Sequence, residues 1–149
     1  MQRKDKITMP NKLLFEQVLD YIGLGKDVTI RIKGNSMRPF LKEDDTVILK
    51  PFKLKELKKG LIVLAQLNGQ MVLHRVVKYD NAKIWLAGDN NLVARELVSC
   101  ADVVATVTSV NRSKTAVKLT QRWRRYLGQA WYLIRPFRRV IRKLCENDF

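Results

Sequence analysis

The sequence predicts a mainly β domain with one helix at each end. Residues 28–33 alternate apolar and polar side chains, which is typical of a strand with one buried face. Two longer apolar runs, residues 61–67 and 71–79, flank the dipeptide Asn68-Gly69, which is a strong signal for a tight β-hairpin. The chain contains short strands joined by turns, with no repeat and no low-complexity linker. This pattern indicates a single, mainly β domain.

The remaining elements of the β domain follow in chain order. Residues 11–22 carry apolar side chains at helical spacing and are followed by Gly23, so we expect a helix whose apolar stripe packs on the sheet or, as the less favoured alternative, forms a wall of a substrate groove. Residues 46–50 indicate a strand that Pro51 ends. Further strands are expected at residues 83–87, 102–110 and 115–119.

From about Thr120 the pattern changes to that of a basic amphipathic helix, which we expect to be kinked at Pro136. We therefore divide the chain into a β domain, residues 1–119, and a C-terminal helix, residues 120–149. The apolar stripe of this helix consists of Trp123, Tyr126, Leu127, Ala130, Trp131, Ile134, Phe137, Val140, Ile141 and Leu144.

Charge is distributed unevenly along the chain, whose net charge is +15. Residues 103–145 hold eleven Lys and Arg and no Asp or Glu, while the rest holds 14 acids and 18 bases. A basic amphipathic helix can lie in a membrane interface with its arginines toward anionic lipid, or it can dock on its own domain. Its charge would attract nucleic acid non-specifically, but no recognition motif accompanies it, so we expect no nucleic-acid partner.

Length and composition set further bounds. The 149 residues fit one domain with a sizeable core, and 46% hydrophobic residues argue against disorder. No run reaches the 18 apolar residues of a membrane span, and the N-terminus lacks a signal-peptide core. We therefore expect a cytoplasmic protein that its C-terminal helix could hold at the membrane surface. Cys100 and Cys145 are expected to be reduced, and no metal or cofactor is expected.

Ser36 and His74 are the candidate catalytic residues. Ser36 lies in the turn Gly34-Asn35-Ser36-Met37-Arg38-Pro39, and His74, the single histidine, lies within the second hairpin strand. Nucleophilic catalysis needs a hydroxyl and a base that accepts its proton near neutral pH, which imidazole does best. Taken alone, each residue could instead be structural, as a turn serine or a core histidine.

These segments resemble the serine endopeptidase superfamily that contains signal peptidases and the self-cleaving domains of LexA-type repressors. The resemblance covers about residues 28–110. It rests on the Ser36 turn and on Asp45-Thr46-Val47, His74-Arg75-Val76 and Gly88-Asp89-Asn90-Asn91. It implies the complex β fold of that superfamily, with Ser36 as nucleophile. It also implies His74 as general base, as in the archaeal and ER-type signal peptidases, where bacterial enzymes use lysine.

The resemblance also suggests the rest of the site. Asp89 is the favoured carboxylate for orienting His74, with Asp102 as an alternative. ER-type enzymes carry further acids after the Gly-Asp-Asn loop, and residues 92–96 match them incompletely. Gly34 stands where signal peptidases often have an oxyanion-binding serine, so backbone N–H groups, above all that of Ser36, are expected to bind the oxyanion. The predicted oxyanion and substrate-binding residues are Gly34, Asn35, Met37 and Pro39.

The function that these features predict is a serine endopeptidase that cleaves a precursor or leader peptide. By resemblance, the substrate lies extended beside a strand near Ser36, with a small residue such as Ala before the cut. The alternative is a catalytically inactive, peptide-binding or regulatory member at a membrane surface. A regulator of the LexA type is disfavoured, because residues 1–27 are too short for a DNA-binding domain and contain no Ala-Gly cleavage pair.

Overall fold

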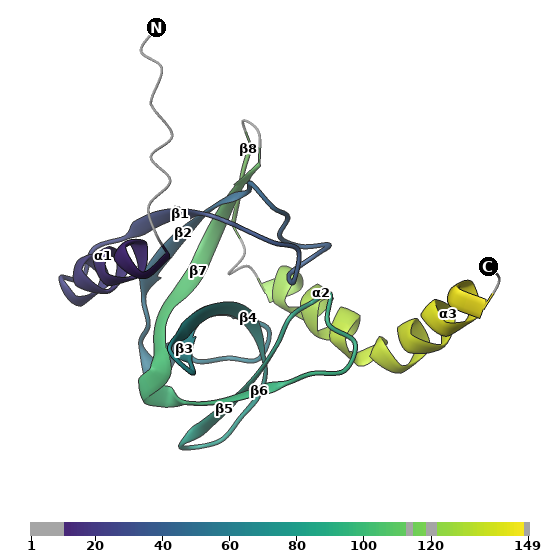
Figure 1. The fold of residues 1–149 in the computed structure, drawn as a ribbon. Helices are drawn as coiled ribbons and strands as arrows, with labels where there is room; N and C mark the ends of the chain where they lie inside the picture. The colour runs from purple at the N-terminus through teal and green to yellow at the C-terminus, as the bar shows by residue number, and fades with distance from the viewer. Residues whose placement is uncertain (1–10, 113–114, 119–121, 148–149) are drawn as a thin grey trace, which may run out of the picture.

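One antiparallel sheet of eight strands forms the body of the protein, in a computed structural model that describes residues 11–112, 115–118 and 122–147 (Figure 1). The strand order is β1-β2-β7-β3-β4-β5-β6, with β8 paired to β7. The strands are β1 (Val28–Arg31), β2 (Thr46–Pro51), β3 (Ile62–Leu67), β4 (Gln70–Tyr79), β5 (Lys83–Ala87), β6 (Glu96–Ser99), β7 (Val103–Arg112) and β8 (Thr115–Lys118). The predicted mainly β fold is confirmed, and β6 is the strand that the sequence pattern did not predict.

Strand β3 lies at the centre of the core because both of its faces are buried. Ile62 and Leu64 point into one apolar cluster, and Val63 and Ala65 point into the other. Side chains alternate between the faces of a strand, so a strand buried on both sides carries a continuous apolar run instead of an alternating one. The two clusters fix the neighbouring strands β4 and β7 against β3.

The N-terminal helix α1 (Asn11–Gly23) packs beside β1 and β2, as expected from its apolar spacing (Figure 1). Val18 and Ile22 are its buried residues, and they join the cluster that also holds Met37 and Leu41. Two short 3-10 turns, Leu54–Glu56 and Cys100–Asp102, connect strands, and Asp102 caps the second one by accepting a hydrogen bond from the Ser99 N–H.

The C-terminal segment forms two helices instead of one kinked helix. Helix α2 (Arg122–Leu133) ends just before Ile134, and α3 (Arg135–Asn147) begins one residue before Pro136. Figure 1 shows α2 against the β body and α3 extending away from it. The predicted boundary between residues 119 and 120 and the side chain of Trp123 lie outside the described residues. Among the described helices, none is both long and apolar enough to cross a membrane.

Candidate active site

Ser36 is presented to solvent by a turn whose next residue is anchored in the core. The turn lies between β1 and β2, and Gly34 adopts a φ of +80° there, a conformation that a residue with a side chain rarely takes. Ser36 is exposed, whereas Met37 is only 2% exposed and packs in the cluster of α1 and β2. Opposite burial of two neighbouring residues therefore holds the Ser36 side chain outward.

Met37, predicted as a substrate-binding residue, is buried in the structure. Its buried side chain anchors the turn, and Leu41, which is also fully buried, donates its N–H to the Met37 carbonyl at 2.9 Å. Gly34, Asn35 and Pro39 remain exposed in the same turn, and the peptide bond before Pro39 is cis.

His74 is held by a carboxylate on its Nδ1 side. It lies within β4, is 9% exposed, and its Nδ1 is 2.7 Å from Oε2 of Glu96, the first residue of β6. An ionised carboxylate can only accept hydrogen bonds, so Nδ1 carries the proton and Nε2 of the neutral ring has a free lone pair. This arrangement prepares Nε2 to accept a proton.

Gly88 lies where the Ser36 turn and the His74 ring meet. A Cβ atom at this position would be 2.8 Å from the Ser36 carbonyl oxygen and 3.2 Å from His74 Nε2. The next-but-one residue, Asn90, donates its N–H to the same Ser36 carbonyl at 2.9 Å. The loop after β5 thus brings the backbone of Ser36 close to the imidazole nitrogen that is available as a base. The absence of a side chain at residue 88 makes this approach possible.

Asp89, the carboxylate that the sequence favoured as the partner of His74, is bound elsewhere. Its two oxygens accept hydrogen bonds from Nε and Nη2 of Arg75, both at 2.7 Å, and the two side chains are 2% and 3% exposed. Burial raises the pKa of the Asp89 carboxyl, while the Arg75 guanidinium lowers it. The carboxylate that contacts His74 is therefore that of Glu96, whereas Asp89 is paired with Arg75. The alternative, Asp102, caps its own turn.

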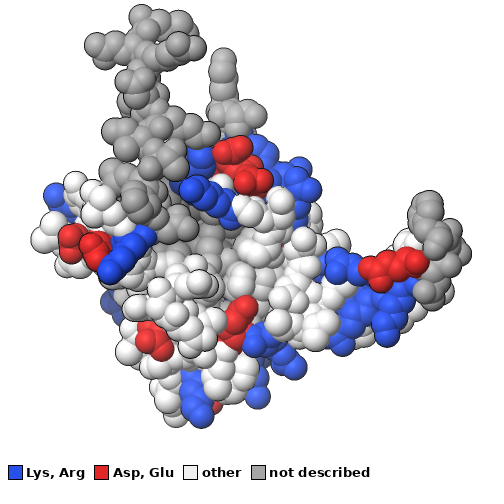
Figure 2. All heavy atoms as spheres, viewed as in Figure 1, with Lys and Arg blue, Asp and Glu red and all other residues white. Residues whose placement is uncertain are grey.

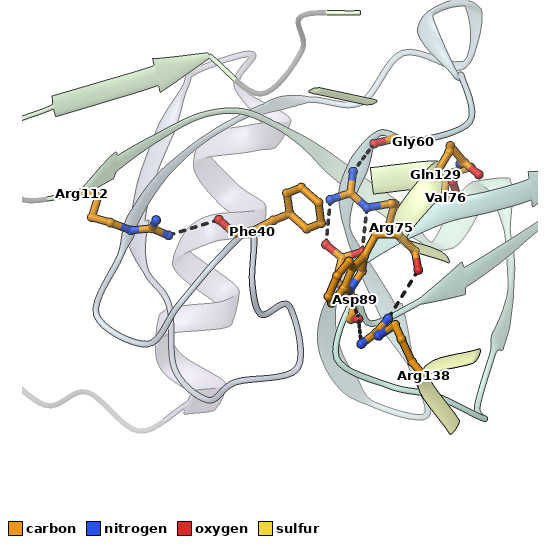
Figure 3. Close-up of polar contacts among 9 residues, drawn as sticks. Phe40, Gly60, Arg75, Val76, Asp89, Arg112, Gln129 and Arg138 are labelled. Carbon is orange, nitrogen blue, oxygen red and sulfur yellow. Dashed lines mark hydrogen bonds and ion pairs between the residues drawn. The ribbon is translucent and has the colours of Figure 1, made fainter. Parts of the chain in front are cut away.

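Arg75 is enclosed on several sides, as Figure 3 shows. Its Nη1 donates to the Gly60 carbonyl at 2.7 Å, and its guanidinium carbon lies 4.9 Å from the centre of the Phe40 ring. Helix α2 closes the remaining side through Gly128, where a Cβ atom would lie 2.2 Å from that carbon. The buried ion pair thus joins β4, the loop after β5 and α2 into one unit behind the candidate site.

The loop that follows Gly88 is fixed by donors from the C-terminal helices. The Asp89 carbonyl accepts hydrogen bonds from Trp131 Nε1 at 2.9 Å and from Arg138 Nη2 at 3.1 Å. Arg135 donates to the carbonyls of Asn91 and Ala94, and Arg139 donates to that of Leu92. The backbone carbonyls of an irregular loop have no hydrogen-bond partners in a sheet. Here the side chains of the C-terminal helices donate the missing hydrogen bonds. Trp131, predicted to lie in the apolar stripe, therefore faces the body.

The described residues contain no group of three or more His, Cys, Asp or Glu side chains that could hold a metal ion. The groups that the structure brings near one another are the Ser36 turn, the His74 imidazole and the Glu96 carboxylate. Arranged in this order, such groups are suited to nucleophilic attack assisted by a base.

Comparison with known proteins agrees with this chemistry at the level of the family. The family described as Peptidase S24-like matches residues 2–110, which include Ser36, His74, Gly88 and Glu96. No curated protein matches the chain significantly.

Proposed function

Because the chain belongs to the Peptidase S24-like family, we propose that it is a serine endopeptidase whose nucleophile is Ser36 and whose general base is His74. The observation that carries the proposal is the position of the imidazole: Nδ1 is bound to Glu96, and Nε2 is directed at the glycine that touches the Ser36 turn. A core histidine that only satisfied its own hydrogen bonds would not need a neighbouring glycine next to an exposed serine.

The proposed reaction follows from these positions. Ser36 Oγ attacks the carbonyl carbon of the scissile peptide bond while His74 Nε2 takes the hydroxyl proton. The imidazolium that results is stabilised by the Glu96 carboxylate, and it then gives its proton to the leaving amine. Water, activated by the same nitrogen, hydrolyses the acyl-enzyme and releases Ser36.

The oxyanion is proposed to bind backbone N–H groups, because Gly34 offers no hydroxyl two residues before the nucleophile. The N–H of Ser36 is the first such donor. The exposed side of the turn, with Gly34, Asn35 and Pro39, is the proposed contact surface for an extended peptide. A small residue such as Ala before the cut, in a precursor or leader peptide, is the substrate that the resemblance to signal peptidases suggests.

The experiment is cleavage of a mixture of internally quenched peptides that carry Ala before the central bond. Ser36→Ala should abolish cleavage, and Glu96→Gln should lower kcat/KM by about 100-fold or more, because the neutral amide no longer stabilises the imidazolium. Glu56→Gln, an exposed glutamate in the first 3-10 turn, is the matched control and should cleave like the wild type. Cleavage that persists in Ser36→Ala would contradict Ser36 as the nucleophile, and a wild type that cleaves none of the peptides would favour the inactive, peptide-binding alternative.

A further inference from the structure

Three arginines of helix α3 contact the protein body, and the large apolar side chains of the helix are exposed to solvent. Arg135, Arg138 and Arg139 reach back to carbonyls of the loop at residues 89–94. The usual amphipathic helix of a soluble domain does the opposite and buries its apolar stripe. Figure 2 shows basic side chains along the projecting α3 arm.

The outward face carries a continuous apolar strip. Phe137 is 72% exposed, and Leu133, at the end of α2, is 71% exposed. Residues three and four positions apart lie on one face of a helix, so the exposed apolar residues of α3 share one face, and Leu133 and Ile134 precede them where α2 meets α3. This outer strip consists of Leu133, Ile134, Phe137, Val140, Ile141 and Leu144.

The docking of α3 fixes the direction of this strip. Because the arginines on the opposite face are bound to loop carbonyls, the helix cannot turn its apolar side inward without breaking those hydrogen bonds. A row of six exposed apolar side chains is unfavourable in water and marks a surface that another apolar phase covers.

Charge identifies what covers it. Arg142 and Lys143 are exposed beside the strip, and no acid occurs between residues 103 and 145. A hollow at the edge of the strip is lined by two apolar and two cationic side chains, Leu92, Ile141, Arg138 and Arg142, of which Arg138 also donates to the Asp89 carbonyl. This combination suits the phosphate and upper acyl chain of an anionic lipid. A second copy of this chain fits less well, because it would bring two proteins of charge +15 together along basic helices.

We propose that the outer strip inserts into the interface of an anionic bilayer, with α3 parallel to the surface. The body lies on the other side of α3, since the arginines that bind the loop at residues 89–94 point away from the strip. This loop also contacts the Ser36 turn through Asn90, so the docked protein holds the candidate site close to the membrane surface. The docking surface does not depend on the peptidase proposal.

The test is flotation of the full-length protein with vesicles of phosphatidylcholine, with and without phosphatidylglycerol. The wild type should float only with the anionic vesicles, and salt should reduce the bound fraction. Phe137→Ser/Ile141→Ser should weaken partitioning by about tenfold or more, because two inserted side chains are lost. Arg142→Gln/Lys143→Gln should weaken it mainly at low salt. Leu24→Ser/Leu54→Ser, two exposed leucines remote in sequence from α3, is the matched control and should bind like the wild type.

Three results would overturn the proposal. The first is a wild type that does not float with anionic vesicles. The second is a strip variant that floats as well as the wild type. The third is a wild-type dimer, measured by light scattering, that becomes monomeric in the strip variant while neither protein binds vesicles, which would assign the strip to a second copy. Cleavage of the soluble quenched peptides is measured separately, so its failure and the failure of vesicle binding are distinguishable.

Discussion

Gly88 offers the sharpest test of the proposed site, because a methyl group added there would press on the backbone of Ser36, the proposed nucleophile, and on the imidazole of His74, the proposed base. Gly88 has no positive φ, so alanine is compatible with the backbone. Its Cβ would nevertheless lie 2.8 Å from the Ser36 carbonyl oxygen and 3.2 Å from His74 Nε2. Both contacts are closer than van der Waals distance, so the Ser36 turn, the imidazole or both must move by several tenths of an ångström.

The expected consequence is a large loss of activity with a moderate loss of stability. A displacement of about 1 Å between reacting groups costs on the order of 100-fold in rate, so a shift of several tenths of an ångström should cost about tenfold. Overpacking costs about 1–3 kcal/mol in the free energy of unfolding. The assay is kcat/KM on the quenched peptides, with unfolding by denaturant measured in parallel. Gly23→Ala is the matched control, because no heavy atom lies within 4 Å of its Cβ and its φ is not positive.

Wild-type kcat/KM in a folded Gly88→Ala protein would refute the reasoning, since a displaced Ser36 turn or His74 ring would then have no effect on cleavage. A loss of activity in both glycine variants would also count against it.

Two further predictions concern the supports of the site. Arg112 binds Asp45 through both carboxylate oxygens and holds the pKa of Asp45 below its ordinary value of 3.8. The stabilisation of the folded state by this ion pair is therefore present above pH 3.8 and is lost as the pH falls through the lowered pKa. Asp45→Asn should cost about 1 kcal/mol near neutral pH, since Arg112 is partly exposed, and the difference from the wild type should shrink in denaturant titrations below pH 3.8. Gly128→Ala should lower the melting temperature much more than Gly23→Ala, because its Cβ would meet the guanidinium of Arg75, which Asp89 and Gly60 prevent from moving. Equal melting temperatures of the two alanine variants would show that α2 does not pack on Arg75 as described.

The strands could be predicted because most of them have one buried face or end at a clear turn. The alternation at residues 28–31 and the turn at Asn68-Gly69 both appear in the structure. β6 escaped prediction because its four residues, Glu96–Ser99, are too few to show a period and follow an irregular loop.

The third residue of the site could not be predicted because its contact crosses the sheet. Glu96 and His74 are 22 residues apart in sequence, and β5 lies between their strands. Asp89 was the reasonable choice from its motif, but it follows directly after the glycine that meets His74, and its side chain turns to Arg75 instead. The one sequence signal for Glu96 is the resemblance to ER-type signal peptidases, which carry further acids after this loop.

The orientation of the C-terminal helices is also beyond what a hydrophobic pattern predicts. The pattern shows that α3 has two faces, but which face docks depends on partners elsewhere in the fold. Here the partners are loop carbonyls, which accept hydrogen bonds from arginine and offer nothing comparable to an apolar side chain. Trp131 departs from the stripe for a related reason, since its ring nitrogen binds the Asp89 carbonyl and its ring packs edge-on against Phe40.

The most direct measurement of the central claim is the coupling between Ser36 and His74. Cleavage of the quenched peptides is compared for the wild type, Ser36→Ala, His74→Ala and the double variant, with circular dichroism to establish that each is folded. If the two residues act as one unit, each single variant loses nearly as much kcat/KM as the double variant. Losses that multiply independently in the double variant would show that His74 does not act on the Ser36 hydroxyl and would contradict the account.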